Sequence, residues 1–315
     1  MGRYILKRLL LLVAVILGVI VVVFTLLYLA PGDATSVILG NSYTEAAAAE
    51  MRATLGLDRP YIVQLLNYIV NLVRFEFGNS WVSGVPVASQ LMFRLPRTLL
   101  ISAFSITLTA VFGILLGVTA AVNQNKWPDS LSMVVALLGT SLPAFFFALL
   151  LVLLFSFRLG LLPAYGLGGP QYYILPVIAT ALGGIAMLAR QTRSSMLEVK
   201  NSDFVKMAKA KGVRKRDLIF KHMLPNAMIP VLTTIGMLFA GVIGGGIIIE
   251  TVFTIPGVGY YLVTGCYNRD YNVVMACTIV ISIIFAAIML LVDILMAAVD
   301  PRIKAQFAGS RKGGK

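Results

Sequence analysis

Charged side chains are scarce in this chain of 315 residues: 12% of them are Asp, Glu, Lys or Arg, while 59% are hydrophobic. Soluble globular domains carry about 25% charged and about 45–50% apolar residues. So small a charged fraction leaves too little polar surface to face water on all sides, which excludes an ordinary soluble domain. The apolar residues also fall in long blocks, which is typical of membrane spans.

Residues that bind metals or carry out catalysis are equally scarce. The chain has two cysteines, Cys266 and Cys277, and one histidine, His222, with no second histidine to pair with it. One such cysteine pair indicates neither a disulfide framework nor a metal cluster. The sequence contains no G-x-x-x-x-G-K-[ST] phosphate loop, no H-E-x-x-H and no plausible nucleophile–base pair. We therefore expect no enzyme activity, no metal site and no cofactor bound by this chain.

Six apolar blocks approach or exceed the roughly 20 residues that a helix needs to cross about 30 Å of hydrocarbon. They are Leu9–Leu29, Thr98–Val122, Leu131–Phe157, Ile174–Ala189, Ile229–Ile249 and Val273–Val299. The short fourth block is extended by the interfacial aromatic pair Tyr172 and Tyr173. The first block is longer than the apolar core of a secretory signal, so we interpret it as an uncleaved helix. The sequence predicts an all-α membrane protein with six transmembrane helices.

The net charge of +13 fits a nucleic-acid-binding surface, a solvated basic face or membrane topology. The positions of the charges decide between them. With the N-terminus inside, the inner segments hold 19 Lys and Arg and the outer segments hold seven, five of these in the loop 30–97. Because Lys and Arg collect on the cytoplasmic side of spans, both termini are predicted to be cytoplasmic. We expect the positively charged segments to lie next to the bilayer and not to bind nucleic acid.

The chain is therefore predicted to have four regions. An N-terminal helix (1–30) is followed by an outer loop (31–97), a five-helix core (98–300) and a cytoplasmic tail (301–315). The core includes a large basic inner loop (190–228).

The outer loop contains two predicted helices. Thr44 and Gly56 flank the first as its N-terminal cap and its C-terminal residue. Pro60 begins the second, which is amphipathic. Its apolar side chains at helical spacing are Tyr61, Leu65, Tyr68 and Leu72. Two interpretations stay open: a small cap that packs on the spans, or a docking surface for an external partner.

The inner loop reads N-S-D-F-V-K-M-A-K-A-K-G-V-R-K-R-D-L-I-F-K-H-M-L-P-N-A-M-I-P. Ser202 or Asp203 is predicted to cap a short helix that ends at Gly212, and Asp217 to cap a second that stops near Pro225. Both are expected to lie along the membrane face, at right angles to the spans. Small residues on the first helix allow close approach by another protein, and its lysines keep it near anionic lipid.

The inner loop resembles the EAA loop of binding-protein-dependent ABC importer permeases, through D-F-V-K-M-A-K-A-K-G and then K-H-M-L-P-N-A-M-I-P. The closest resemblance is to their oligopeptide/dipeptide/nickel branch. Further motifs of that branch follow one another along nearly the whole chain: A-P-G-D (30–33), L-G-L-D-R-P (55–60), F-G-N-S (77–80), R-L-P-R-T (94–98), E-T-V-F-T-I-P-G-V-G (250–259) and D-P-R (300–302). P-G-D and G-L-D-R-P point to the first of the two permease types in this branch. The chain departs from the family pattern at Ala34, Met207 and Pro225, and where R-F-E-F-G precedes Asn79.

The resemblance implies the type I ABC importer permease fold, with a cytoplasmic coupling helix that fits a groove on an ATPase. It implies four kinds of partner in a bacterial inner membrane: a second homologous permease, two cytoplasmic ABC ATPases that bind ATP and Mg, an extracytoplasmic solute-binding protein, and the bilayer. It implies peptides as the cargo, with nickel chelates, glutathione or another small solute as alternatives.

Two sets of candidate site residues result. The ATPase-coupling set is Asp203, Phe204, Met207, Ala208, Lys209, Ala210, Lys211, Gly212, His222 and Asn226. The set for the pathway or for helix packing is Gly241, Gly244, Gly245, Gly246, Glu250 and Asp293. Glycines let helices pack closely or leave room along a pore, and both interpretations stay open.

The two carboxylates near the ends of the spans have different expected roles. Glu250 is a candidate for a structural hydrogen bond to the following F-T-I-P-G loop or for solute contact, and Asp293 for pairing with a basic residue. An ion-coupled secondary transporter would need buried charges in several central spans, whereas only Asp293 lies clearly inside one. An intramembrane enzyme would need a catalytic constellation that the sequence lacks.

Overall fold

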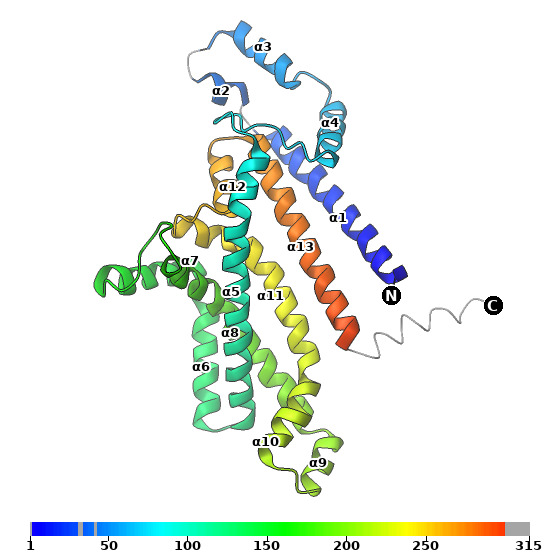
Figure 1. Cartoon of the computed structure of the whole chain (residues 1–315), viewed down its shortest axis with the longest axis vertical. Helices are drawn as coiled ribbons and strands as arrows, with labels where there is room; N and C mark the ends of the chain where they lie inside the picture. Colours follow the sequence, from blue (N-terminus) through cyan, green and yellow to red (C-terminus); the bar gives the residue numbers. More distant parts are fainter. Residues whose placement is uncertain (1, 31–33, 41–42, 300–315) are drawn as a thin grey trace, which may run out of the picture. The chain divides into compact units, whose positions relative to one another are not determined.

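A computed structural model describes residues 2–30, 34–40 and 43–299 (Figure 1). Apart from an isolated β-bridge between Asn79 and Pro86, the regular elements in these ranges are helical. The α-helices are α1 (Gly2–Leu29), α2 (Ala34–Leu39), α3 (Glu45–Leu55), α4 (Tyr61–Val73), α5 (Val87–Val122), α6 (Trp127–Ser141), α7 (Ala144–Leu151), α8 (Gln171–Lys200), α9 (Asp203–Ala210), α10 (Lys215–Asp217), α11 (Leu224–Val252), α12 (Val258–Tyr267) and α13 (Tyr271–Val299). Two π-helical segments are η1 (Val152–Arg158) and η2 (Leu218–Met223). The predicted tail (301–315) and the D-P-R motif lie outside the described residues.

The chain divides into two compact units. The core unit comprises Leu99–Ile255 and the part of α13 from Ala287 onward. The loop unit comprises the chain up to Thr98 together with Pro256–Ala286.

Five helical stretches in the described part of the chain are long and apolar enough to cross a membrane: Arg8–Leu29, Val87–Val122, Gln171–Lys200, Lys215–Gly244 and Tyr271–Ile294. A sixth crossing is possible through α6 and the helix Ala144–Arg158, taken together. The predicted third span was wrong in one respect, because this pair is bent by 103° instead of forming one continuous helix. Pro143 stands at the break with an extended ψ of 136°. Its ring removes a backbone N–H that a continuous helix would need.

The inner loop is more helical than predicted. α8 continues to Lys200, past the predicted end of its span at Ala189. The second inner helix is not separate: α10, η2 and α11 follow one another without a gap. Pro225 therefore does not end a helix. It stands at the second residue of α11, directly after the π-helical segment η2.

Glycines let α5 and α8 approach closely in the core unit. A Cβ atom at Gly117 would stand 2.5 Å from Thr192 Cβ and 2.6 Å from the Ala189 carbonyl oxygen. A Cβ atom at Gly113 would stand 2.8 Å from Leu188 Cβ. Contacts this short are not tolerated, so only glycine allows the two helices to pack at this distance. The hydroxyls of Ser105 and Thr109, also on α5, donate to α8 carbonyls at 3.3 Å each.

Aromatic packing dominates the loop unit. The predicted apolar face of α4 packs with Ile20 and Phe24 of α1 and with Met275 and Ile279 of α13. The Tyr61 ring lies 5.1 Å from that of Tyr28, and its hydroxyl is 2.7 Å from the Thr25 hydroxyl. This contact supports the interpretation of α4 as a cap.

The predicted ends of α3 are confirmed. Thr44 Oγ1 accepts from the Ala47 N–H, and Gly56 adopts a left-handed φ of 70°.

Candidate coupling helix and pathway residues

Local signals define α9, the short helix at the end of the core unit where α8 ends and α11 begins (Figure 1). Ser202 is its N-cap residue by backbone conformation, but its hydroxyl donates to the Val199 carbonyl (2.6 Å) instead of capping the helix. Asp203 lies in the first turn, where a negative charge is favourable. It also pairs with Lys206 at 2.9 Å.

The C-terminus of α9 is a Schellman motif. The Gly212 N–H donates to the Lys209 carbonyl (3.0 Å) and the Val213 N–H to the Ala208 carbonyl (3.2 Å). Gly212 has a left-handed φ of 72°, which a residue with a side chain adopts only under strain. The prediction that Gly212 ends this helix is confirmed.

α9 has a buried face and an exposed face. Val205 is fully buried in a cluster whose other members are Ala121, Met196, Leu218, Met223 and Ala227. These residues belong to α5, α8, η2 and α11, so α9 is held to all four elements. Ala208 packs against the same cluster. On the exposed face, Phe204 is 40% and Met207 is 60% accessible.

The other candidate coupling residues are polar or small. Lys209, Ala210 and Lys211 are exposed at the end of α9. The Asn226 side chain donates from Nδ2 to the His222 carbonyl (2.7 Å), which links the last turn of η2 to α11. The structure therefore brings His222 and Asn226 together, and α9 contacts the η2 segment that carries His222.

Gly241 and Gly244 of α11 are exposed, whereas Gly246 is buried. A Cβ atom at Gly241, Gly244 or Gly246 would meet no atom of the described chain within 4 Å, whereas one at Gly236 would stand 2.4 Å from a Val292 methyl carbon. Gly245 lies between them in the same helix. Packing among the described residues therefore requires Gly236, but it does not require Gly241 or Gly244.

The two candidate carboxylates differ in burial. Glu250 is 2% exposed in the last turn of α11. Its neighbours Ile249 and Phe253 belong to a cluster with Ile101 of α5 and Leu175 of α8. This burial favours the structural role of Glu250 over direct contact with a solute. Asp293 is half-buried in α13.

An ion pair that was not predicted from the sequence joins α6 to α8. Arg193 Nε and a second guanidinium nitrogen approach the two Asp129 carboxylate oxygens at 2.6 and 2.7 Å. The side chain of Asp129 is 5% exposed and that of Arg193 is 26% exposed. Asp129 also accepts from the Asn125 N–H at 2.9 Å. W-P-D-S marks Asp129 as a first-turn acid of a helix, but no sequence signal links it to Arg193.

Asp270, which was also not predicted as a functional residue, organises part of the loop unit. Its carboxylate accepts from the Ser80 hydroxyl (2.5 Å) and from the Val273 N–H (3.3 Å). The second of these bonds caps the N-terminus of α13. The side chain is 2% exposed. Asp270 thus ties the F-G-N-S segment to the start of α13.

Comparisons with known proteins match one kind of membrane protein along nearly the whole chain. Residues 113–305 match the family described as "Binding-protein-dependent transport system inner membrane component", and residues 1–102 match its N-terminal family. The glutathione transport system permease protein GsiC of Salmonella typhimurium is 41% identical over 304 residues, which cover 96% of this chain and 99% of that protein. GsiC of Escherichia coli strain K12 matches to the same extent.

Two solved structures have a similar fold. The inward-facing MetNI methionine ABC transporter matches with a TM-score of 0.60 at 16% identity, covering 68% of this chain and 98% of that chain. An amino acid ABC transporter matches with a TM-score of 0.50 at 15% identity, covering 68% and 94%. At these identities the likeness concerns the fold alone.

Proposed function

Because the chain belongs to the family of binding-protein-dependent transport system inner membrane components, we propose that it forms half of a translocation pathway for short peptides. The chain is an ABC importer permease with the type I fold and several apolar helices. The observation that carries the proposal is its 41% identity, over nearly its whole length, to permeases of a peptide-like solute.

Peptide and glutathione are closely related as cargo, since glutathione is a modified tripeptide with free carboxylates. The name of the GsiC relatives favours glutathione as the second candidate. Both solutes require a pathway that tolerates a polar backbone and a negative charge. The exposed glycines Gly241 and Gly244 of α11 form the part of the core unit that suits contact with the second permease or passage of such a solute.

We assign the motor to separate ATPase subunits that bind ATP and Mg, because the sequence has no phosphate-binding loop. The exposed face of α9 is the contact for one of them. Phe204 and Met207 are large apolar side chains exposed beside several lysines. An apolar anchor within a polar rim is the usual composition of a protein interface.

The charge distribution supports cytoplasmic termini, with α9 inside and with α3 and α4 outside. In this topology an external solute-binding protein delivers the cargo on the side of α3 and α4.

The test of the proposed function is uptake by the complete system. Proteoliposomes with both permeases, the ATPases and the binding protein should accumulate labelled tripeptide or glutathione when ATP is supplied to the ATPase side. The chain alone should not. Uptake of neither solute by an assembled, ATP-hydrolysing complex would contradict the proposal, and so would robust ATP-dependent uptake by the chain alone.

The coupling role of α9 needs a variant that leaves the packing of the chain intact. Ala208→Glu is unsuitable because Ala208 packs inward. Met207→Glu places a charge on the exposed face instead. We expect it to weaken ATPase association by about tenfold, or about 1.4 kcal/mol, and Met207→Leu to leave association unchanged. Co-purification and coupled ATP hydrolysis measure both effects. Full coupling in Met207→Glu and in Phe204→Glu would rule out this surface.

A further inference from the structure

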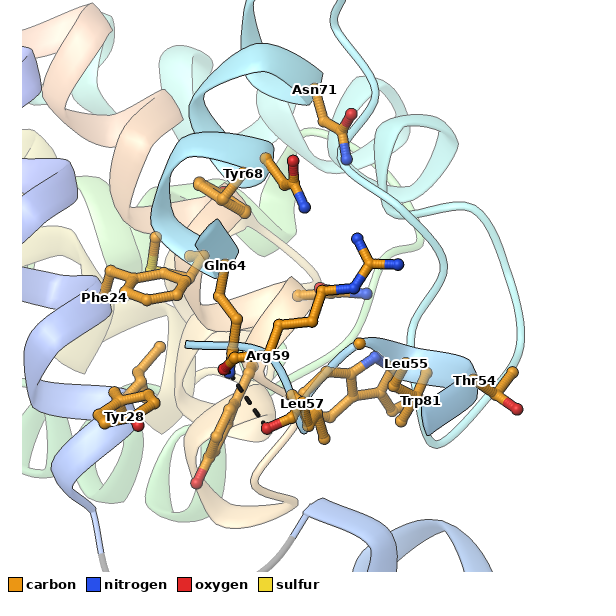
Figure 2. Close-up of a pocket in the computed structure, with 16 residues that line it drawn as sticks. Phe24, Tyr28, Thr54, Leu55, Leu57, Arg59, Gln64, Tyr68, Asn71 and Trp81 are labelled. Atoms are coloured by element: carbon orange, nitrogen blue, oxygen red, sulfur yellow. Dashed lines mark hydrogen bonds between the residues drawn. The ribbon is translucent and has the colours of Figure 1, made fainter. Parts of the chain in front are cut away.

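The loop unit contains a cavity of about 500 Å³ (Figure 2). Its wall comes from the end of α1, the segment between α3 and α4, α4 itself, Trp81 and the first turn of α13. All of these belong to the loop unit, so the cavity lies within one compact body. Its volume falls in the range of about 300–1,000 Å³ that is typical of small-molecule sites.

Several hydrogen-bond donors of the cavity lining are exposed and available to a ligand, among them those of Arg59, Asn67 and Asn71. The Arg59 guanidinium, the side-chain amides of Asn67 and Asn71 and the Trp81 indole N–H make no hydrogen bond or ion pair within the residues that the structure describes. Figure 2 shows the Arg59 side chain reaching into the cavity, with Asn71 and Trp81 on either side of it. The described lining includes no Asp or Glu. Arg59 therefore makes the cavity favourable for an anion.

Internal hydrogen bonds hold the walls in place. Gln64 Nε2 donates to the Leu57 carbonyl (3.1 Å) and to the Arg59 carbonyl (2.7 Å), which fixes the backbone that carries the guanidinium. The Trp81 and Tyr271 rings of the lining pack with their centroids 5.2 Å apart. A site whose walls are already ordered loses less entropy when it binds a ligand.

These groups match one kind of ligand. A guanidinium presents a planar set of donors that fits a carboxylate with two parallel hydrogen bonds. Side-chain amides pair with peptide N–H and C=O groups. The Trp81–Tyr271 pair offers an aromatic surface for an apolar side chain. A cationic ligand would meet only Arg59 and no acid in the described lining.

We propose that this cavity binds the carboxylate end of a short peptide, with Arg59 holding the carboxylate and Asn67 and Asn71 holding the adjacent peptide groups. The proposal rests on the proposed function as a peptide importer. It gives the permease a peptide site of its own, on the side of the membrane assigned to α3 and α4. This site is additional to that of the solute-binding protein.

The chain carries a built-in reporter for this site. Its two tryptophans are Trp81, in the cavity wall, and Trp127, at the start of α6 in the core unit. Trp127→Phe leaves Trp81 as the single tryptophan of the full chain. Trialanine, and trialanine whose C-terminus is an amide, can then be titrated into this variant in lipid nanodiscs while the Trp81 fluorescence is followed.

We expect trialanine to change the fluorescence saturably, and Arg59→Gln to raise its Kd by at least about tenfold. The amide should bind weakly to both forms, because it lacks the group that Arg59 recognises. Arg74→Gln is the matched control, since Arg74 is an exposed arginine of the loop unit outside the cavity lining. It should leave the Kd unchanged.

Three results would overturn the proposal: no saturable change with millimolar trialanine, equal affinity for trialanine and its amide, or an unchanged Kd in Arg59→Gln. If Arg59→Gln loses affinity for the solute-binding protein while trialanine binds as before, the cavity is a docking surface and the proposal is also wrong. Uptake by the complete system separates the two proposals. Uptake without binding at Trp81 refutes only the cavity site, whereas absent uptake refutes the proposed function whatever the fluorescence shows.

Discussion

The core unit and the loop unit are held together in different ways. In the core unit, glycines bring α5 against α8 so closely that a single added methyl group has no room. In the loop unit, α4 packs through tyrosines on α1, and a cavity of about 500 Å³ stays open. Small side chains therefore bring the helices of the core unit close together, whereas the loop unit keeps a space of a size that small molecules occupy.

The largest effect is expected at the ion pair of the core unit. Asp129→Ala leaves the partly exposed Arg193 without its carboxylate, and loss of hydrogen bonds to a charged group costs about 1.5–3 kcal/mol. Thermal unfolding of the purified chain measures the loss.

Two variants serve as controls for the ion pair. The double variant Asp129→Ala/Arg193→Ala should lose less stability than the sum of the single losses. Lys206→Ala breaks an exposed pair with Asp203 and should cost no more than about 1 kcal/mol. Equal losses in Asp129→Ala and Lys206→Ala would contradict the special role of the buried pair.

A second prediction compares two glycines of the core unit. Gly117→Ala forces a methyl group against Thr192 and the Ala189 carbonyl, and such overpacking costs about 1–3 kcal/mol. Gly241→Ala meets open space and should leave the chain as stable or stabilise it by up to about 1 kcal/mol, because alanine favours helix.

An uptake assay should distinguish the role of Gly241 from that of Gly117. We expect Gly241→Ala to insert normally but to reduce uptake by the complete system, because its open face is assigned to the second permease or to the solute. Normal uptake in Gly241→Ala would remove that assignment. Equal stability of Gly117→Ala and the unmodified chain would show that α5 and α8 can separate at low cost.

The smallest effect is expected at Asp270 in the loop unit. Asp270→Ala removes the cap of α13 and the acceptor of the Ser80 hydroxyl, and loss of an N-terminal cap costs about 0.5–2 kcal/mol. Asp270→Asn keeps an oxygen acceptor and should lose less. Asn268 is exposed and lies two residues before Asp270, so Asn268→Ala should unfold at the same temperature as the unmodified chain. A loss in Asn268→Ala as large as that in Asp270→Ala would mean that the carboxylate is not the source of the stability.

Features that depend on a few neighbouring residues were predictable. The crossings follow from long apolar blocks, because a helix in lipid satisfies its own backbone groups. Thr44, Gly56 and Gly212 mark helix ends through side-chain and backbone geometry that extends over four or five residues. Pro225 shows the limit of such signals, because this proline lies within a continuous helical stretch instead of ending it.

The sequence by itself therefore determined that this is a helical membrane protein with a basic segment between its fourth and fifth apolar blocks, and its motifs indicated the permease family. Only the tertiary structure decided which residues meet. Asp129 pairs with Arg193 across 64 positions and Ser80 with Asp270 across 190, and no local pattern relates residues that far apart. The same holds for α11, where a neighbouring helix makes Gly236 obligatory and leaves Gly241 open. The physical reason is that local propensity acts through adjacent backbone groups, whereas burial and ion pairing depend on which surfaces the folded chain brings into contact.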